Sequence, residues 1–320
     1  LDGRVVFVPG ALPGERVAAA VIDQSVAVWR AELLEVLEPS EARVEPACPH
    51  VARCGGCDWM HIRRAERQAL HQASVRHELE AAIGALAIEF AYHAPSDELG
   101  YRTRARWSIE RNVRVGYRAR RSRRVVEIDR CIVLRPELQT MSATLGQILA
   151  GSRGVGEATT AVGADARPVL EVRWKGSLDG GALARASALV DAGVIAGARL
   201  WPDGSSAALE CGDARPVVAA PDGRPLPIVF DGFSQSSVAG GVLLASRVAG
   251  PIGHCSGRLV ELFAGCGTLS LALAPLTESM LAVEQSAAAA EQLRRNLRAA
   301  GAAHVKVRVA DANELALPKP

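Results

Sequence analysis

Three of the chain's seven cysteines, Cys48, Cys54 and Cys57, lie within the short stretch CPHVARCGGCDWMH. The Cys-x5-Cys-x2-Cys spacing offers three thiolates to a metal centre, which then needs a fourth ligand. A histidine or a cysteine would complete a zinc tetrahedron, whereas an iron–sulfur cluster calls for a fourth thiolate. The candidates for the fourth ligand are His50, His61, Cys131, Cys211, Cys255 and Cys266. Spacing alone leaves zinc and iron–sulfur open, with isolated buried cysteines as a third interpretation.

The number and positions of the other cysteines narrow the choice of fourth ligand. An odd number of cysteines cannot pair completely into disulfides, so a disulfide framework is disfavoured. Cys266 lies inside a glycine-rich turn and is excluded if that turn binds a ligand. Cys131, in the segment EIDRC that follows an arginine-rich stretch, is the best-placed fourth ligand.

The glycine-rich turn is in ELFAGCGTLS, where an apolar strand runs into Gly265 and Gly267 and then into a helix. Small residues let a ligand approach the backbone, and the first helical amides are free donors. A dinucleotide fingerprint would place a third glycine where this chain has Ser270. Glu261 within the strand and Glu284 at the end of the next strand instead match the S-adenosylmethionine pocket of class I methyltransferases, in which the second acid holds the ribose. A turn that only packs helix on sheet is the alternative.

Ten arginines fall between positions 102 and 124. Strand alternation places Arg102, Arg104 and Arg106 on one face and apolar side chains on the other, and the segment ERN can turn the chain back into a second strand. A solvated basic face is the simplest interpretation. Because aligned like charges repel one another, an anionic partner explains the pattern better, and RNA suits arginine and nearby tyrosines.

The composition fits a globular protein of several domains. The chain has 320 residues, 49% of them apolar, a net charge of +2 and no apolar run long enough to cross a bilayer. No signal peptide is visible, although the chain opens on Leu1 rather than Met, and the cysteine usage favours a reducing, cytoplasmic setting.

The predicted elements divide the chain into three parts. Residues 1–45 read as a small β-barrel, or part of one, and residues 46–225 as a mixed, mostly antiparallel β domain that contains the cysteines. A helix is expected over 62–84 because apolar residues recur at helical spacing before a closing glycine, and it could pack on the third domain. Residues 226–320 alternate strand and helix, which predicts a parallel, Rossmann-like α/β sheet, incomplete within these residues.

These motifs together resemble the iron–sulfur RNA 5-methyluridine methyltransferases. CPHVARCGGCDWMH followed by EIDRC is similar to their cysteine pattern, PGALPGERV and EVLEPS to their RNA-binding TRAM barrel, and FSQSS, ELFAGCGTLSLALA and AVEQS to their cofactor segments. The resemblance implies a structural 4Fe-4S cluster on Cys48, Cys54, Cys57 and Cys131. It implies S-adenosylmethionine contacts from Gln235, Phe263, Gly265, Gly267, Thr268, Glu284 and Asp311. Two positions depart from the family, which usually has asparagine at Thr268 and at Ser237.

The implied reaction is methylation of C5 of a uridine in ribosomal or transfer RNA. In the family a cysteine thiolate adds to C6, C5 takes the methyl group, and a base removes the C5 proton. The resemblance places that cysteine and a glutamate base beyond Pro320. The 320-residue chain itself is therefore expected to bind RNA and cofactor without turnover. The alternatives are a non-catalytic iron–sulfur RNA-binding protein and a nicotinamide-dependent oxidoreductase, which the missing third glycine disfavours.

Overall fold

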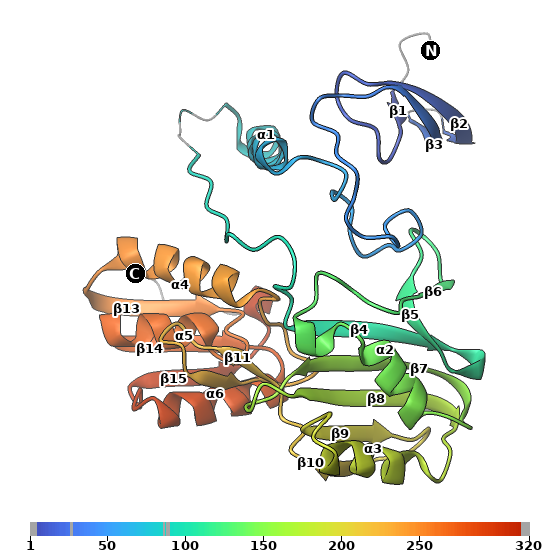
Figure 1. Cartoon of the computed structure of the whole chain (residues 1–320). Helices are drawn as coiled ribbons and strands as arrows, with labels where there is room; N and C mark the ends of the chain where they lie inside the picture. Colours follow the sequence, from blue (N-terminus) through green and yellow to red (C-terminus); the bar gives the residue numbers. More distant parts are fainter. Residues whose placement is uncertain (1–4, 26–27, 86, 88–89, 315–320) are drawn as a thin grey trace. The chain divides into compact units, whose positions relative to one another are not determined.

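A computed structural model describes residues 5–25, 28–85, 87 and 90–314 (Figure 1). The chain divides into two compact units. The first comprises Leu1–Tyr92 with Arg118–Arg123, and the second comprises His93–Tyr117 with Arg124–Pro320. Among the described residues, no helix has the length and apolar character needed to span a membrane.

The first unit begins with a three-stranded sheet of β1 (Val6–Phe7), β2 (Arg16–Gln24) and β3 (Trp29–Glu38), in the order β1-β3-β2. The Glu15 carboxylate ties this sheet to the segment that follows, because it accepts hydrogen bonds from the Arg43 guanidinium and from the amides of Leu12 and Ser40. Chiefly through the Arg43 hydrogen bond, the pKa of Glu15 falls to about 2. The expected closed barrel stays a prediction.

The helix expected over 62–84 is α1 (Arg64–Ile83), which ends at Gly84 with a left-handed φ of 86°. None of its residues is buried, and Val75 and Ile83 are exposed apolar side chains. Its expected packing on the C-terminal domain stays a prediction.

The second unit contains the mixed, mostly antiparallel sheet that the sequence predicts. In their order across the sheet its strands are β10 (Leu209–Gly212), β9 (Gly197–Trp201), β8 (Pro168–Ser177), β7 (Arg153–Val162), β4 (Arg104–Glu110), β5 (Arg114–Arg118) and β6 (Val125–Glu127). Among the described strand pairs of this sheet, β8 and β9 run parallel to each other. Figure 1 shows α2 (Met141–Ile148) and α3 (Ala182–Asp191) together over one face of this sheet.

Residue alternation explains which face of β4 is buried. In β4 the side chains of Ala105, Trp107 and Ile109 are fully buried, and the Trp107 indole nitrogen donates to Thr160 Oγ1 at 2.9 Å. The β4–β5 hairpin turns through Asn112, whose φ is 62°. Gly116 in β5 is obligatory, since a Cβ there would lie 1.9 Å from the carbonyl oxygen of Val126.

The C-terminal part of the second unit is a parallel sheet in the order β13-β14-β15, joined to the mixed sheet through a short ribbon, β11 (Val217–Ala219) with β12 (Pro225–Pro227). Its remaining elements are α4 (Val238–Ile252), β13 (Cys255–Leu262), α5 (Thr268–Leu273), β14 (Thr277–Glu284), α6 (Ala287–Ala299) and β15 (Val305–Val309). Met280, Ala282, Leu293 and Leu297 form its core between sheet and α6.

Candidate functional site

The glycine turn joins β13 to α5 at the carboxyl edge of the parallel sheet. Gly265 and Gly267 have φ values of 58° and 102°, and Phe263 also has a left-handed φ of 58°. The φ of Gly267 favours glycine, and a Cβ there would lie 2.5 Å from Leu293 Cδ1, so that this buried side chain of α6 would have to shift. A left-handed phenylalanine is a strained conformation of the kind that collects at functional sites.

Glu284, at the end of β14, directs its carboxylate at this turn. Its Oε2 accepts a hydrogen bond from the amide of Gly265 at 2.8 Å, and its Oε1 accepts one from the amide of Ser286 at 2.8 Å. The structure therefore brings together the two motifs that the sequence pairs as a cofactor site. Carboxylate lone pairs that these amides leave unused are available to a ligand's hydroxyls.

The third strand of the parallel sheet leads to Asp311 at the same edge, since parallel strands share their carboxyl edge. The Asp311 carboxylate accepts hydrogen bonds from the Asn313 amide at 2.9 Å and from Asn313 Nδ2 at 3.0 Å. Asp311 thus shapes a turn. Its expected contact with S-adenosylmethionine stays a prediction.

The segment 231–237, which contains FSQSS, packs against the glycine turn. A Cβ on Gly232 would lie 3.9 Å from Cys266 Sγ, and one on Gly265 would lie 3.7 Å from the carbonyl oxygen of Phe233. Gln235 is exposed. The Phe233 and Phe263 side chains are 77% and 71% exposed, which is unusual for aromatic rings of this size.

Ser237 and Phe233 lie two residues to either side of Gln235. Ser237 caps α4, since its Oγ accepts a hydrogen bond from the Gly240 amide at 3.0 Å, and asparagine would serve the same purpose. The sequence predicts no role for Phe233, although its place two residues before Gln235 puts it in the same candidate site.

Ser270 and Glu261 form a buried pair beneath the turn. The Ser270 hydroxyl donates to Glu261 Oε2 at 2.5 Å, which joins α5 to β13. Burial raises the pKa of Glu261 to about 7, against a smaller opposing effect of the Ser270 hydrogen bond. The residue that stands in place of a third glycine therefore has a structural role.

Asn296 on α6 is a buried support of the turn that the sequence did not reveal. Its Nδ2 donates to the carbonyl oxygen of Cys266 at 2.8 Å and to that of Pro227 at 2.9 Å. Gln292 donates in turn to Asn296 Oδ1 at 2.9 Å. One side chain thus connects the glycine turn, α6 and the β11–β12 ribbon.

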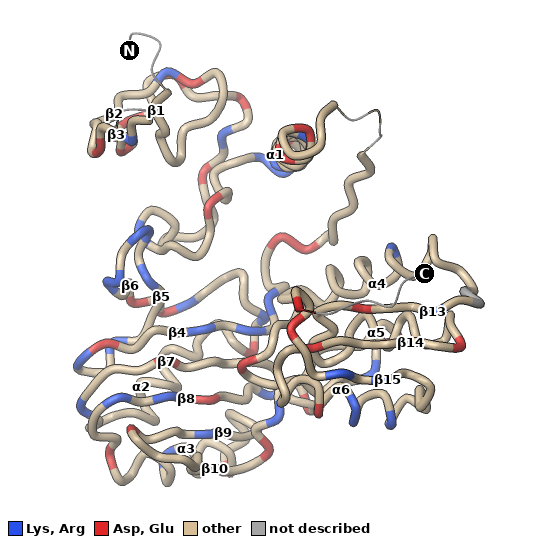
Figure 2. The backbone as a smooth tube through the Cα atoms, turned by 180° about the vertical axis from the view of Figure 1, so that it is seen from behind, with Lys and Arg blue, Asp and Glu red and all other residues tan. Residues whose placement is uncertain are grey.

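In β4, Arg104 and Arg106 alternate with the buried Ala105 and Trp107, as the sequence predicts, whereas Arg102 lies before the strand. Figure 2 shows basic positions recurring along β4 and around the segment between β5 and β6. Arg102 and Arg106 are exposed, whereas Arg104 is partly buried and donates to the carbonyl oxygen of Gly232. Tyr117 stacks on Trp107 with ring centroids 4.6 Å apart, so one face of the tyrosine ring is covered by protein. Binding of RNA by these arginines stays a prediction.

The cysteine loop lies in the first unit, where it contacts residues 118–120, at the end of β5 and in the segment between β5 and β6. The Gly55 amide donates to the carbonyl oxygen of Arg118 at 3.0 Å, and Arg120 forms an ion pair with Asp58. Cys54 is buried, and its Sγ accepts a hydrogen bond from the Gly56 amide at 3.4 Å. Cys131 belongs to the second unit, where its amide donates to the carbonyl oxygen of Gln139.

The predicted metal centre is not confirmed. Within the part of the chain that the structure describes, no group of three or more Cys, His, Asp or Glu residues is arranged to hold a metal ion. The side chain of Cys255, one alternative ligand, lies outside the described part. Convergence of Cys131 with the other three cysteines stays a prediction.

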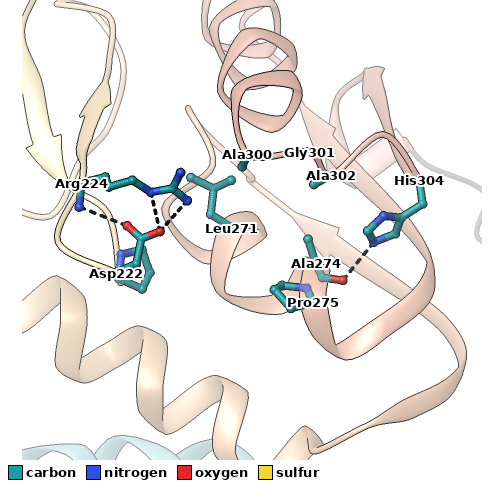
Figure 3. A pocket seen from close by; sticks show the side chains of 10 residues that line it. Asp222, Arg224, Leu271, Ala274, Pro275, Ala300, Gly301, Ala302 and His304 are labelled. Carbon is teal, nitrogen blue, oxygen red and sulfur yellow. Dashed lines mark hydrogen bonds and ion pairs between the residues drawn. The ribbon is translucent and has the colours of Figure 1, made fainter.

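A cavity of about 390 Å³ lies elsewhere in the second unit (Figure 3). Small apolar residues line it, together with the Asp222–Arg224 ion pair and His304, whose Nε2 lies 2.9 Å from the carbonyl oxygen of Ala274. The segments that lead into β14 and β15 form its wall, so it lies at the amino edge of the parallel sheet. None of the predicted cofactor residues lines it.

Comparison with known proteins identifies the family of the chain. No protein-family profile matches it. The 23S rRNA (uracil(1939)-C(5))-methyltransferase RlmD of Pseudomonas entomophila is 33% identical over 315 residues, covering 92% of this chain and 67% of the relative. RlmD of Halomonas elongata is 33% identical over 342 residues, covering 98% and 68%. The chain belongs to the RlmD family of RNA uracil-C5 methyltransferases.

A solved structure supports the fold of this RlmD-family chain. The tRNA (uracil-54, C5)-methyltransferase of Pyrococcus abyssi, in complex with S-adenosyl-L-homocysteine, has a TM-score of 0.72 and covers 98% of this chain and 77% of its own. At 17% identity the likeness concerns the fold alone. The chain spans about two thirds of the length of the RlmD relatives.

Proposed function

We propose that this chain binds S-adenosylmethionine at the glycine turn and positions its methyl group for transfer to C5 of a uridine in 23S ribosomal RNA. The observation that carries this proposal is the Glu284 carboxylate, 2.8 Å from the Gly265 amide, beside a turn whose two glycines have left-handed φ values. An acid at the end of the second strand is suited to hold a ribose diol. Ribosomal RNA is favoured over transfer RNA because the relatives at 33% identity are named for it.

The remaining residues of the site have roles that follow from their chemistry. The exposed rings of Phe233 and Phe263 offer apolar faces for the adenine or for a flipped uracil. The exposed Gln235 amide can both donate and accept, as pairing with a uracil edge requires. The exposed guanidinium groups of Arg102 and Arg106 are suited to RNA phosphates. The thiolate that adds to C6 and the base that removes the C5 proton are not assigned to residues of this chain.

The choice of RNA can be tested by equilibrium binding in the presence of S-adenosylhomocysteine. Fluorescence anisotropy would compare a 23S rRNA fragment that contains the uridine named in the relatives, the same fragment with a scrambled sequence, and unmodified tRNA. We expect the ribosomal fragment to bind at least tenfold more tightly than the other two. Equal affinity for all three would contradict the substrate assignment while leaving the cofactor site untouched.

We also propose that Cys48, Cys54, Cys57 and Cys131 hold a 4Fe-4S cluster with a structural role. The donor types fit, because four thiolates are the usual ligands of such a cluster and an amide hydrogen bond to a cysteine sulfur, as between Gly56 and Cys54, is a common feature around it. The cluster would supply cross-linking of distant segments rather than a redox step.

The cluster is tested by iron and sulfide analysis of the chain purified anaerobically. We expect four iron and four sulfide per chain. Cys131→Ser should lose most of both, and Cys211→Ser, the matched control in β10, should keep them. Zinc in place of iron, or equal iron in the two variants, would contradict the assignment.

A further inference from the structure

Residues 102–104, which lead into β4, hold the segment 231–237. The amide of Thr103 donates to the carbonyl oxygen of Ser236 at 2.9 Å. Arg104 Nη1 donates to the carbonyl oxygen of Gly232 at 2.5 Å, and Arg102 forms an antiparallel bridge with Ser237. The strand therefore contacts both ends of the segment that carries Phe233 and Gln235.

Arg104 and Arg106 share one face of β4 but lie in different surroundings. Arg104 is opposite Ala161 of β7, and Ala161 belongs to a small buried cluster with Val169 and Phe230. Arg106 is opposite Thr159 and its side chain is exposed. Burial, with the nearby charge of Arg106, lowers the pKa of Arg104 from its usual range, while Asp231 and Glu171 oppose that effect. A guanidinium in such a position is less accessible to a phosphate than its neighbour.

The carbonyl group that accepts from Arg104 belongs to Gly232, which lies beside the glycine turn. Gly232 is close enough to Cys266 that a Cβ on it would lie 3.9 Å from the cysteine Sγ. Cys266 lies between the two glycines of the turn, and its own carbonyl is fixed by Asn296. A shift of Gly232 would therefore move the backbone that packs on the turn.

We infer that Arg104 is a positioning residue, which fixes the segment 231–237 against the glycine turn through the carbonyl of Gly232, and that RNA contact on this strand belongs to the exposed Arg106. The inference rests on the proposed function, because it assigns Arg104 to the cofactor side of the same site. It differs from the expectation based on strand alternation, which treats the arginines as equivalent.

The experiment compares Arg104→Met with the matched control Arg106→Met. Calorimetry measures S-adenosylhomocysteine affinity, and anisotropy measures affinity for the 23S rRNA fragment at several salt concentrations. For Arg104→Met we expect cofactor affinity to fall about tenfold, the typical effect of losing a charge-assisted hydrogen bond, with RNA affinity in the absence of cofactor within about twofold of wild type. For Arg106→Met we expect unchanged cofactor affinity, weaker RNA binding and a salt slope reduced by about 1.

Each other outcome has a defined meaning. Unchanged cofactor affinity in Arg104→Met overturns the inference, and so does a loss of RNA affinity and salt slope equal to that of Arg106→Met. If Arg104→Met does not fold, two milder variants take its place, Arg104→Lys and Thr103→Val. The second removes the hydroxyl that donates to the Ser236 carbonyl oxygen at 3.3 Å. Both must then weaken cofactor binding. Absence of S-adenosylhomocysteine binding by the wild-type chain would instead refute the proposed function.

Discussion

At the residue scale, Glu261 beneath the glycine turn makes stability depend on pH. Its carboxyl is buried within β13 and accepts the Ser270 hydroxyl, and its pKa is raised from 4.5 to about 7. A raised folded-state pKa means that the native state binds the proton more tightly than the unfolded state does. The contribution of Glu261 to stability is therefore fully present below about pH 4.5 and is lost as the pH rises to about 7.

Glu261→Gln should remove this pH dependence, because the amide cannot ionise and still accepts the Ser270 hydroxyl. We expect the difference in unfolding free energy between variant and wild type to grow in favour of the variant by about 3 kcal/mol between pH 4.5 and pH 8. Urea unfolding at several pH values measures it, with the exposed Glu278→Gln as control. A difference that is flat with pH would contradict the raised pKa.

Ser237 supports the second prediction at this scale. Its Oγ caps α4 through the Gly240 amide at 3.0 Å. Ser237→Ala should lower the unfolding free energy by about 1 kcal/mol, whereas Ser237→Asn, the residue usual in the family, should keep it within about 0.5 kcal/mol. Ser246→Ala, an exposed site on the same helix, provides the control. Equal losses in the alanine and asparagine variants would show that the cap is not the cause.

At the element scale, the conformation of the glycine turn depends on neighbouring elements as much as on its own glycines. α6 supports the turn twice, since Leu293 packs where a Cβ of Gly267 would lie and Asn296 holds the carbonyl of Cys266. The sequence indicated the strand, turn and helix correctly, because glycines and hydrophobic periodicity are local signals. It gave no sign of Asn296, because its partners at 227 and 266 are far away in sequence.

Asn296→Ala should therefore weaken S-adenosylhomocysteine binding. It leaves the carbonyl oxygens of Cys266, where the bond is buried, and Pro227, where it is partly buried, without this donor, at a cost of about 2 kcal/mol, and frees the turn to move. We expect the affinity to fall at least fivefold in calorimetry. Arg295→Ala, exposed on the same helix, should bind as wild type does. Wild-type affinity in Asn296→Ala would mean that the turn keeps its shape without this support.

At the scale of the whole molecule, the sequence correctly predicted the mixed sheet, the parallel α/β part and the family. Their patterns repeat over many residues, so single exceptions do not obscure them. It did not distinguish Arg104 from Arg106, because strand alternation sets the face of a side chain but not what covers that face. Here the segment 231–237, more than a hundred positions away, makes the difference, because Arg104 donates to the carbonyl oxygen of Gly232. Arg118–Arg123 group with the cysteine loop through contacts between segments that lie far apart in the sequence.

The central claim is that Glu284 and the glycine turn form a site for S-adenosylmethionine. The most direct test is calorimetric titration of the chain with S-adenosylhomocysteine and with NAD, repeated on Glu284→Gln and on the exposed control Glu278→Gln in the same strand. We predict one S-adenosylhomocysteine per chain, no measurable NAD binding, and at least a tenfold loss of affinity only in Glu284→Gln. Binding of NAD instead, or equal S-adenosylhomocysteine affinity in the two variants, would contradict the account.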